Sequence, residues 1–242
     1  MGEFSLKTAI WAHRGASGYA PENTMAAFAL ALQMGADGLE LDVHLTRDGV
    51  VVVAHDETLE RVSNGTGRFV DYTFAQLRAL NFGNSEKLPT LEEVYAMIKP
   101  TKLQINVEIK SGIVLYEGIE KKILGIAKAA GMNERVIYSS FNHYSLMTLR
   151  QICPSAKIGL LYQCALVDPW LYAQHIHADA LHPFYPTLAS PGLVEGCKKA
   201  NVALHPWTVN APEHIKSVLA LGVEAVITNY PDVAIALRDA QP

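Results

Sequence analysis

Short apolar segments alternate with amphipathic segments along almost the whole chain. The apolar segments have the length of buried strands, and the segments between them carry apolar residues every three or four positions, as helices do. The predicted strands are residues 8–12, 38–45, 103–109, 136–139, 157–161, 178–182, 203–209 and 225–228. The predicted helices are residues 24–34, 91–98, 115–130, 144–152, 168–172, 191–200, 212–221 and 231–238.

Eight strand–helix units in 242 residues match the count and size of a TIM (β/α)₈ barrel. Thr24 and Thr90 stand where each can cap the helix that follows, and Glu93 completes a capping box with Thr90. A doubly wound sheet is the alternative, but it would carry a glycine-rich phosphate loop after the first strand. The segment HRGASG at 13–18 is not GxGxxG. We therefore expect a single α/β barrel domain over residues 1–242.

The regular alternation is interrupted once, between the second strand and its helix. Residues 55–89 contain the turn cluster SNGTG and a short helical pattern, TFAQLRAL. A connection this long with elements of its own is typical of a functional insertion. The sequence predicts a small inserted subdomain at 56–89, on the side of the barrel where such enzymes build their sites.

Carboxylates occupy alternate positions in two predicted strands. Glu40 and Asp42 share one face of the second strand, and Glu108 lies near the end of the next. Three carboxylates in one barrel mouth would repel one another strongly unless a cation lay between them. Oxygen ligands favour Mg²⁺ or Ca²⁺ over zinc. The alternative is a surface hairpin with one solvated side.

Groups suited to phosphate chemistry follow the same strands. His13 and Arg14 end the first strand, His55 follows the apolar run VVVA, and Lys110 ends the strand of Glu108. Histidine transfers protons near neutral pH, and arginine and lysine bind phosphate. Each residue alone has a structural explanation, as a core histidine or an exposed strand end. Their convergence on one predicted rim indicates phosphoester chemistry.

Other candidates carry weaker arguments. Phe141 and Trp207 could form an aromatic floor for the alcohol part of a substrate, or could simply pack in the core. His44, His182 and His205 could face the site or be structural.

Composition narrows the function classes further. The net charge of −4 disfavours general nucleic-acid binding, and three scattered cysteines favour free thiols in a reducing compartment. The N-terminal sequence lacks a secretory pattern, and no apolar run approaches the roughly 18 residues of a membrane span. These features predict a cytoplasmic protein.

The motifs AHRGASGYAPENTMAAF, LELDVHLTRDGVVVVAHDETLERVSNGTG, NVEIK and GVEAVITNYPD resemble those of the glycerophosphodiester phosphodiesterases, particularly the small cytoplasmic bacterial type. The resemblance covers nearly the whole chain. It implies hydrolysis of glycerophosphodiesters, such as glycerophosphocholine and glycerophosphoethanolamine, to sn-glycerol 3-phosphate and an alcohol.

The resemblance also implies a role for each candidate residue and one divalent cation, Mg²⁺ or Ca²⁺, with Mn²⁺ possible. One departure is Asn229, where many members have Asp; we expect it to affect only loop detail or specificity. The roles implied are a general acid/base pair (His13, His55), metal ligands (Glu40, Asp42, Glu108) and phosphate contacts (Arg14, Lys110).

Two other functions stay open at this point. The same chemistry could act on lipids, which would require an apolar entrance, or the barrel could bind a phosphorylated ligand without catalysis. We expect a small-molecule substrate, no nucleic acid, no stable membrane association, and a monomer or small homo-oligomer.

Overall fold

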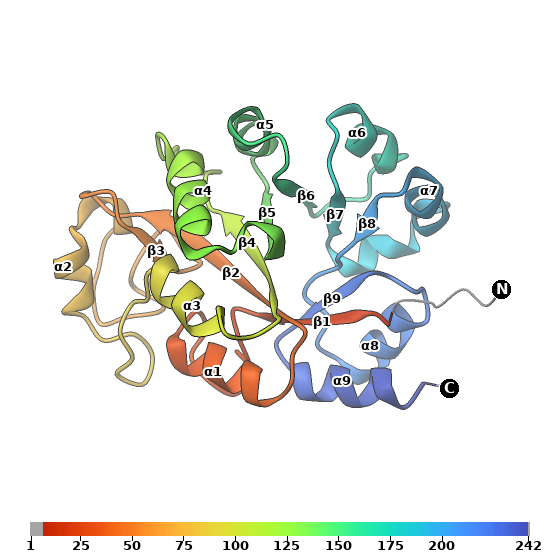
Figure 1. Ribbon diagram of the computed structural model, residues 1–242. Helices are drawn as coiled ribbons and strands as arrows, with labels where there is room; N and C mark the ends of the chain where they lie inside the picture. The colour runs from red at the N-terminus through yellow and green to blue at the C-terminus, as the bar shows by residue number, and fades with distance from the viewer. Residues whose placement is uncertain (1–6, 242) are drawn as a thin grey trace.

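The computed structural model describes residues 7–241, and its centre is a barrel of parallel strands surrounded by helices (Figure 1). Neighbouring strands pair in the order β8-β7-β6-β5-β4-β2-β1-β9, and every pair on this path is parallel. The predicted TIM barrel is confirmed. Its strands are β1 (Ala9–His13), β2 (Gly38–Leu45), β4 (Gln104–Ile109), β5 (Val136–Ser140), β6 (Lys157–Tyr162), β7 (Ala180–Pro183), β8 (Ala203–Leu204) and β9 (Ala225–Thr228).

The barrel closes between β8 and β9 through backbone that is not a regular strand. The predicted strand 203–209 is regular only at Ala203–Leu204. Beyond it, the Ile227 N–H donates to the Pro206 carbonyl (3.0 Å) and the Val209 N–H to the Ile227 carbonyl (2.9 Å). Pro206 has no N–H to donate, so a complete ladder cannot form there. The segment nevertheless joins the two ends of the sheet.

Helices on the outside cover the barrel, and the two predicted threonine caps are confirmed. Thr24 Oγ1 accepts from the Ala27 N–H (3.2 Å), and Thr90 and Glu93 form the predicted capping box. The helices are α1 (Met25–Gln33), α3 (Leu91–Ile98), α4 (Ile119–Ala130), α5 (His143–Ile152), α6 (Pro169–His175), α7 (Leu193–Ala200), α8 (Pro212–Leu219) and α9 (Pro231–Asp239). The helix predicted from 115 begins later because Gly118, at φ 76°, interrupts the helical backbone.

Alternate side chains of β2 and β4 face opposite environments. Leu39, Leu41 and Val43 are buried in the main apolar cluster with residues of the surrounding helices. Glu40 and Asp42 take the positions between them and point to the barrel interior. A period of two therefore places apolar groups against the helices and carboxylates inside.

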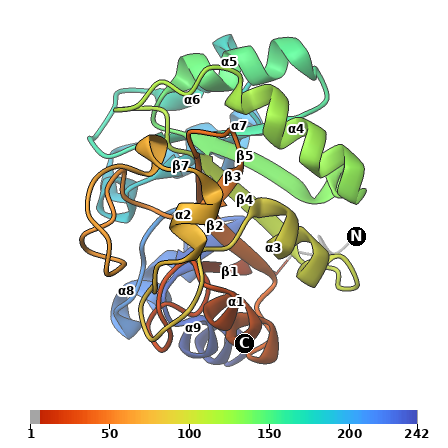
Figure 2. The same cartoon turned by 90° about the vertical axis from the view of Figure 1, so that its left-hand side faces the viewer.

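The segment after β2 turns back as an antiparallel strand, β3 (Val51–Val53), which was not among the predicted strands. A short helix, α2 (Phe74–Arg78), follows, and this segment has an apolar cluster of its own. Figure 2 looks onto the carboxyl ends of the strands, with α2 in front of them. The proposed limits of the insertion, 56–89, stay a prediction. The cluster contains Val52, Ala54, Leu59, Phe69, Leu77, Phe82 and Leu88.

Candidate active site

Three carboxylates meet inside the carboxyl end of the barrel. The parallel register of β2 and β4 sets Asp42 opposite Glu108, with Glu40 two residues earlier on β2. One oxygen from each of the three side chains lies within 4.8 Å of the others, and all three residues are buried. The expected carboxylate cluster is therefore present, and the solvated-hairpin alternative is wrong, because this strand is buried along its length.

Each carboxylate has one oxygen bonded to a donor and one oxygen without a hydrogen bond among residues 7–241. Asp42 Oδ1 is fully buried and is such an unbonded oxygen. Buried carboxylate oxygens without donors suit a hard cation, so the donor set fits Mg²⁺, Ca²⁺ or Mn²⁺. The bonds present are Arg14 N to Glu40 Oε2 (3.0 Å), Asn23 Nδ2 to Asp42 Oδ2 (2.9 Å) and Lys110 Nζ to Glu108 Oε1 (2.9 Å).

Burial and mutual repulsion change the protonation of this cluster. Burial and the charges of Asp42 and Glu108 raise the pKa of Glu40 well above its usual range. Burial, together with Asp42, raises the pKa of Glu108 to about 7. Burial also opposes ionisation of Asp42, but Arg14 and Lys110 lower its pKa to about 2. Without a cation, burial and repulsion therefore favour the protonated forms of Glu40 and Glu108.

His13 ends β1 and is held by an amide. Its Nδ1 lies 2.6 Å from Asn229 Oδ1, while its Nε2 lies 3.5 Å from Thr208 Oγ1 and 3.9 Å from Glu40 Oε2. An amide oxygen only accepts, so Nδ1 carries the hydrogen and Nε2 has the free lone pair. Burial and the Arg14 charge lower the pKa of His13 to about 4. We expected Asn229 to affect only loop detail or specificity; instead it contacts His13 directly.

His55 follows β3 and is held by a carboxylate. Its Nδ1 lies 2.7 Å from Asp56 Oδ1, and its Nε2 lies 3.2 Å from Lys110 Nζ. The Ala54 N–H donates to the Asp42 carbonyl (3.0 Å), which fixes the backbone just before His55 against β2. The two histidines therefore differ in partner: an amide for one and a carboxylate for the other.

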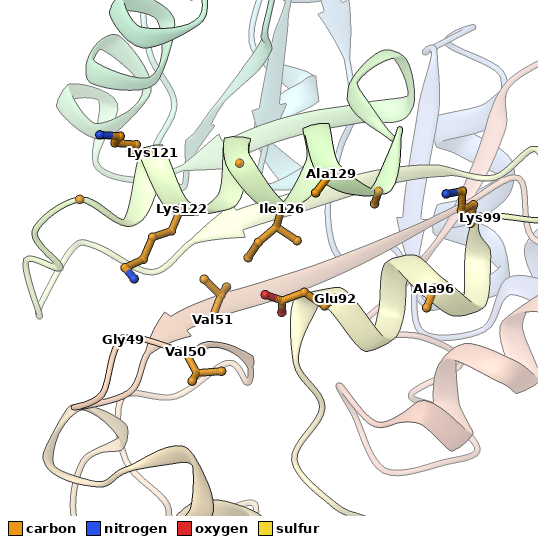
Figure 3. Close-up of a pocket in the computed structure, with 13 residues that line it drawn as sticks. Gly49, Val50, Val51, Glu92, Ala96, Lys99, Lys121, Lys122, Ile126 and Ala129 are labelled. Atoms are coloured by element: carbon orange, nitrogen blue, oxygen red, sulfur yellow. The ribbon is translucent and has the colours of Figure 1, made fainter.

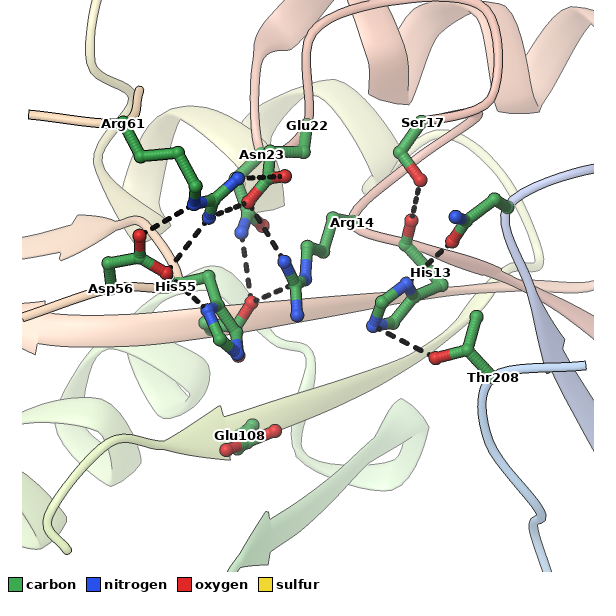
Figure 4. Close-up of polar contacts among 12 residues, drawn as sticks. His13, Arg14, Ser17, Glu22, Asn23, His55, Asp56, Arg61, Glu108 and Thr208 are labelled. Carbon is green, nitrogen blue, oxygen red and sulfur yellow. Dashed lines mark hydrogen bonds and ion pairs between the residues drawn. The ribbon is translucent and has the colours of Figure 1, made fainter. Parts of the chain in front are cut away.

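The two predicted phosphate contacts, Arg14 and Lys110, lie at the edge of the carboxylate cluster. Lys110 Nζ is 3.8 Å from Asp42 Oδ1, and Arg14 Nε is 3.4 Å from Asp42 Oδ2. Figure 4 shows the Arg14 guanidinium between the rings of His13 and His55. The structure thus brings together all seven residues predicted for acid/base catalysis, metal binding and phosphate contact.

Phe141 and Trp207 lie on a different part of the mouth, after β5 and β8. Their rings meet edge to face with centroids 5.6 Å apart, and Trp207 Nε1 donates to the His182 carbonyl (2.8 Å). Phe141 keeps 45% of its surface exposed. The pair forms an aromatic wall on the side of β5 and β8.

The other histidines considered from sequence are buried in the fold. His44 stacks on Phe69 with ring centroids 5.5 Å apart, and its Nδ1 lies 2.8 Å from the Tyr116 hydroxyl. His182 and His205 form a buried pair, with His182 Nε2 3.0 Å from His205 Nδ1. His44 Nε2 also lies 3.2 Å from the His55 carbonyl, so this ring holds backbone of the site from behind. All three histidines are buried among partners of the protein interior, which supports the structural interpretation.

Several residues that touch the candidate catalytic groups were not assigned from sequence, among them Glu22, Asn23 and Asp56. Asp56 follows His55 directly, and Glu22 and Asn23 belong to the quoted motif PENT. Glu22 Oε1 accepts from Arg14 Nη1 (2.9 Å), and Asn23 contacts Asp42. Its position next to His55 could have identified Asp56 from the sequence. No sequence feature pointed to Glu22 and Asn23, because they reach the site only where the β1–α1 connection folds back over β2.

A groove of about 960 Å³ lies elsewhere, between α3 and α4 (Figure 3). Val50, Val51 and Ile126 are among the apolar residues that line it, with lysines at its edge. Its lining shares no residue with the carboxylate cluster or the histidines described above. It is therefore separate from the candidate site.

Comparison with known proteins decides the family. Residues 13–233 match the glycerophosphoryl diester phosphodiesterase family, a span that includes every candidate residue of the site. The chain belongs to this family. The resemblance found in the motifs is thus confirmed, and the chain is an enzyme of the phosphoric diester hydrolase class.

Individual members of the family match over nearly their full lengths. A glycerophosphodiester phosphodiesterase of Caldanaerobacter subterraneus is 49% identical over 239 residues, or 96% of this chain and 98% of that protein. The crystal structure of one from Agrobacterium tumefaciens is 28% identical, with a TM-score of 0.83 over 95% of this chain and 99% of that one. An Oleispira antarctica phosphodiesterase in complex with the product sn-glycerol-3-phosphate is 26% identical, with a TM-score of 0.86 over 98% and 99% of the two chains.

Across residues 7–241, every helix is too short or too polar to span a lipid bilayer.

Proposed function

We propose that this enzyme hydrolyses glycerophosphodiesters, such as glycerophosphocholine and glycerophosphoethanolamine, to sn-glycerol 3-phosphate and an alcohol, and that it requires a divalent cation. One observation carries the proposal: three buried carboxylates with unbonded oxygens lie between two histidines and two permanent cations. The product bound in the Oleispira antarctica phosphodiesterase supports the choice of substrate.

Glu40, Asp42 and Glu108 would hold the cation through the oxygens that lack donors. A bound Mg²⁺, Ca²⁺ or Mn²⁺ supplies positive charge that polarises a phosphate oxygen. Arg14 and Lys110 point their N–H groups toward the same space and bind the remaining anionic oxygens. Arg14 offers a planar fork and Lys110 a point charge, which together orient the phosphate in one pose.

We infer the two proton transfers from the hydrogen-bond partners of the histidines. His13 presents the lone pair of Nε2 while Asn229 holds Nδ1–H, so His13 accepts the proton of the attacking hydroxyl. The Asp56 carboxylate holds His55 at Nδ1 and turns Nε2 toward the site, so we assign to His55 the proton transfer to the departing alkoxide. One P–O bond forms, the P–O bond to the alcohol breaks, and the proton count balances. The attacking oxygen belongs to water or to the glycerol 2-hydroxyl. In the second case the alcohol leaves with formation of a cyclic phosphate, and water opens that ring in a second step to give sn-glycerol 3-phosphate.

The test is a coupled assay for glycerol 3-phosphate with several glycerophosphodiesters. Enzyme treated with EDTA should lose turnover, and addition of Mg²⁺, Ca²⁺ or Mn²⁺ in turn should restore it. Turnover that persists unchanged in EDTA would contradict the metal requirement. Release of a different phosphate product would contradict the cleavage position.

A second candidate substrate is a glycerophosphodiester that carries one acyl chain. Apolar side chains are exposed in the connections after β4 and β6 and around the start of α5, at the end of the barrel that carries the Phe141–Trp207 wall. Apolar groups gathered at a mouth are typical of a surface that binds apolar ligands. The exposed residues are Ile113 (77%), Leu115 (78%), Phe141 (45%), Tyr144 (86%), Leu166 (38%) and Val167 (92%).

Substitution of these loop residues separates the two substrates. Leu115→Ser and Val167→Ser should lower kcat/KM for a short-chain lysophosphatidylcholine and leave turnover of glycerophosphocholine unchanged. Leu221→Ser is the matched control, because Leu221 is also exposed (43%) but follows α8. If wild-type enzyme ignores the acylated substrate while cleaving glycerophosphocholine, the second candidate is wrong and the first stands.

A further inference from the structure

Arg61 of the segment after β3 binds two carboxylates at once. Its Nε and Nη2 donate to the two oxygens of Asp56 (2.6 and 2.9 Å), and its Nη1 and Nη2 donate to the two oxygens of Glu22 (2.7 and 2.7 Å). Figure 4 shows Arg61 between Asp56 and Glu22. The guanidinium therefore joins this segment to the connection between β1 and α1.

Both partners of Arg61 hold residues of the proposed catalytic machinery. Asp56 Oδ1 lies 2.7 Å from His55 Nδ1, and Glu22 Oε1 accepts from Arg14 Nη1 (2.9 Å). Each carboxylate is thus shared between Arg61 and one functional side chain. A shift of the guanidinium would change the position of both at the same time.

The backbone that carries Arg61 is itself anchored. Leu59 is fully buried in the apolar cluster of the segment, and the Val62 and Ser63 N–H groups both donate to the Leu59 carbonyl (3.3 and 2.9 Å). This turn holds Arg61 at a fixed distance from the cluster. The position of the guanidinium consequently depends on the folding of the segment after β3.

Arg61 also lowers the pKa of both carboxyl groups. Hydrogen bonds from Arg61, more than those from His55, hold the pKa of Asp56 far below its usual range. Burial would raise the pKa of Glu22, but bonds from Arg61 and the charge of Arg14 lower it. An ionised Asp56 accepts only, which fixes the hydrogen of His55 on Nδ1 and leaves Nε2 toward the site.

We propose that Arg61 is a positioning residue that sets His55, through Asp56, and Arg14, through Glu22, and so makes the assembled site depend on the folded segment after β3. The proposal rests on the proposed function, because it takes the roles of His55 and Arg14 from there. A lysine could not take over this role, since one ammonium group cannot form two parallel pairs of bonds to two carboxylates.

The alternative is that Arg61 only tethers the segment and has no effect on the chemistry. The matched control for Arg61 is Arg68, an exposed arginine of the same segment that donates two hydrogen bonds to Asp71 (2.9 and 3.0 Å). Arg61→Gln and Arg68→Gln each remove one guanidinium from an arginine–carboxylate pair. Only the first removes contacts that lead to His55 and Arg14.

The experiment measures kcat, KM and thermal midpoint for Arg61→Gln, Arg61→Lys, Arg68→Gln and the partner variants Glu22→Gln and Asp56→Asn, with glycerophosphocholine and saturating cation. Misplacement of reacting groups by about 1 Å costs on the order of a hundredfold in rate. We expect Arg61→Gln to lower kcat by about tenfold or more and to raise KM. Arg68→Gln should match wild type in both.

The partner variants give a pattern that a tether would not produce. Asp56→Asn should lower mainly kcat, because it acts on the proton donor, and Glu22→Gln should raise mainly KM, because it acts on a phosphate contact. Arg61→Gln should do both, and adding it to the double partner variant should change little further. Full additivity of the three, or equal behaviour of Arg61→Gln and Arg68→Gln, overturns the proposal.

A second variant and a spectroscopic measurement cover the cases in which Arg61→Gln does not fold or the enzyme shows no turnover. If Arg61→Gln does not fold, Arg61→Lys retains the charge, and we expect it to fold while its kcat stays below wild type; wild-type kcat in Arg61→Lys overturns the proposal. The spectroscopic measurement is ¹⁵N NMR of histidine-labelled enzyme, in which the Nδ1–H of His55 should lose its hydrogen-bonded shift in Arg61→Gln. This readout holds even if wild-type enzyme cleaves no glycerophosphodiester, so failure of the proposed function is distinguished from failure of the Arg61 proposal.

Discussion

Binding of a divalent cation to this enzyme should release protons, because the cation replaces hydrogens that the carboxylate cluster holds at neutral pH. The ligand oxygens lie within 4.8 Å of one another, so each pair of unit charges repels by about 3.5 kcal/mol at an effective dielectric constant of about 20. The charges of Arg14 and Lys110 offset part of this repulsion, but the pKa of Glu108 still rises to about 7 and that of Glu40 also lies well above its usual range.

The protonation of Glu40 and Glu108 sets the size of the expected change in metal affinity with pH. As pH falls from 7 to 6, Glu108, with its pKa of about 7, goes from about half protonated to mostly protonated without the cation, and burial and repulsion also favour the protonated form of Glu40. A ligand that is fully protonated in the free enzyme weakens apparent affinity about tenfold per pH unit, and Glu108 weakens it about fivefold over this interval. We therefore expect the Kd for Mg²⁺ or Mn²⁺ to rise by about fivefold to fiftyfold over this interval, with about one to two protons released per ion. At a hundred times Kd, the bound ion stabilises the fold by about 2.7 kcal/mol, or about 5–10 °C in Tm for a chain of this size.

The assay is isothermal titration calorimetry at pH 6, 7 and 8 in pairs of buffers with different ionisation enthalpies, which counts the protons directly. Glu108→Gln should lose close to one released proton and much of the affinity. The matched control is Glu195→Gln, because Glu195 is an exposed carboxylate on α7. Tight binding at pH 6 without proton release, or equal effects of the two variants, would refute the argument.

Three further predictions concern the histidines. His13→Ala and His55→Ala should each lower kcat by about 10²–10⁴-fold while the cation still raises Tm, and near-wild-type turnover would contradict their roles. Asn229→Asp should move the acidic limb of the pH–rate profile to higher pH, because a carboxylate offsets the burial and Arg14 charge that lower the pKa of His13 to about 4; an unmoved limb would show that Asn229 does not act on this ring. Burial lowers the pKa of His205 to about 3, so the unfolded chain binds this proton first as pH falls below about 6.5, and stability is lost. Urea unfolding at pH 6, 5 and 4 should show that His205→Gln reduces this slope by about 1.4 kcal/mol per pH unit.

The barrel and most of the candidate site were predictable because they depend on local patterns. Alternation in the second and third predicted strands placed Glu40, Asp42 and Glu108 on one side, and parallel strands bring their carboxyl ends together at one rim. No knowledge of loop conformation was needed for that step. The same argument placed His13 and Arg14, which follow directly from a strand.

Contacts between distant segments were not predictable in this way. His13 and Asn229 are 216 residues apart in sequence and meet only because β1 pairs with β9. Arg61 reaches Glu22 through the fold of a segment whose turns are specified by its own small core. The segment VVV also gave no periodic signal to separate a return strand from an apolar run, so β3 was missed.

The return strand β3 has a consequence for how freely this enzyme can vary. Val53 is paired with Val43, and the Ala54 N–H donates to the Asp42 carbonyl, so His55 and a proposed metal ligand share one hydrogen-bonded ladder. The β2–β3 pairing alone therefore fixes the distance between His55 and Asp42, and the rest of the insertion follows later in the chain. Since lengthening a loop adds only a slowly growing entropic cost, the exposed turn around Asn84 and Ser85 can accept added residues without altering that spacing. Evolution and protein engineering therefore have a place to change the outer surface of the mouth while its chemistry stays constant.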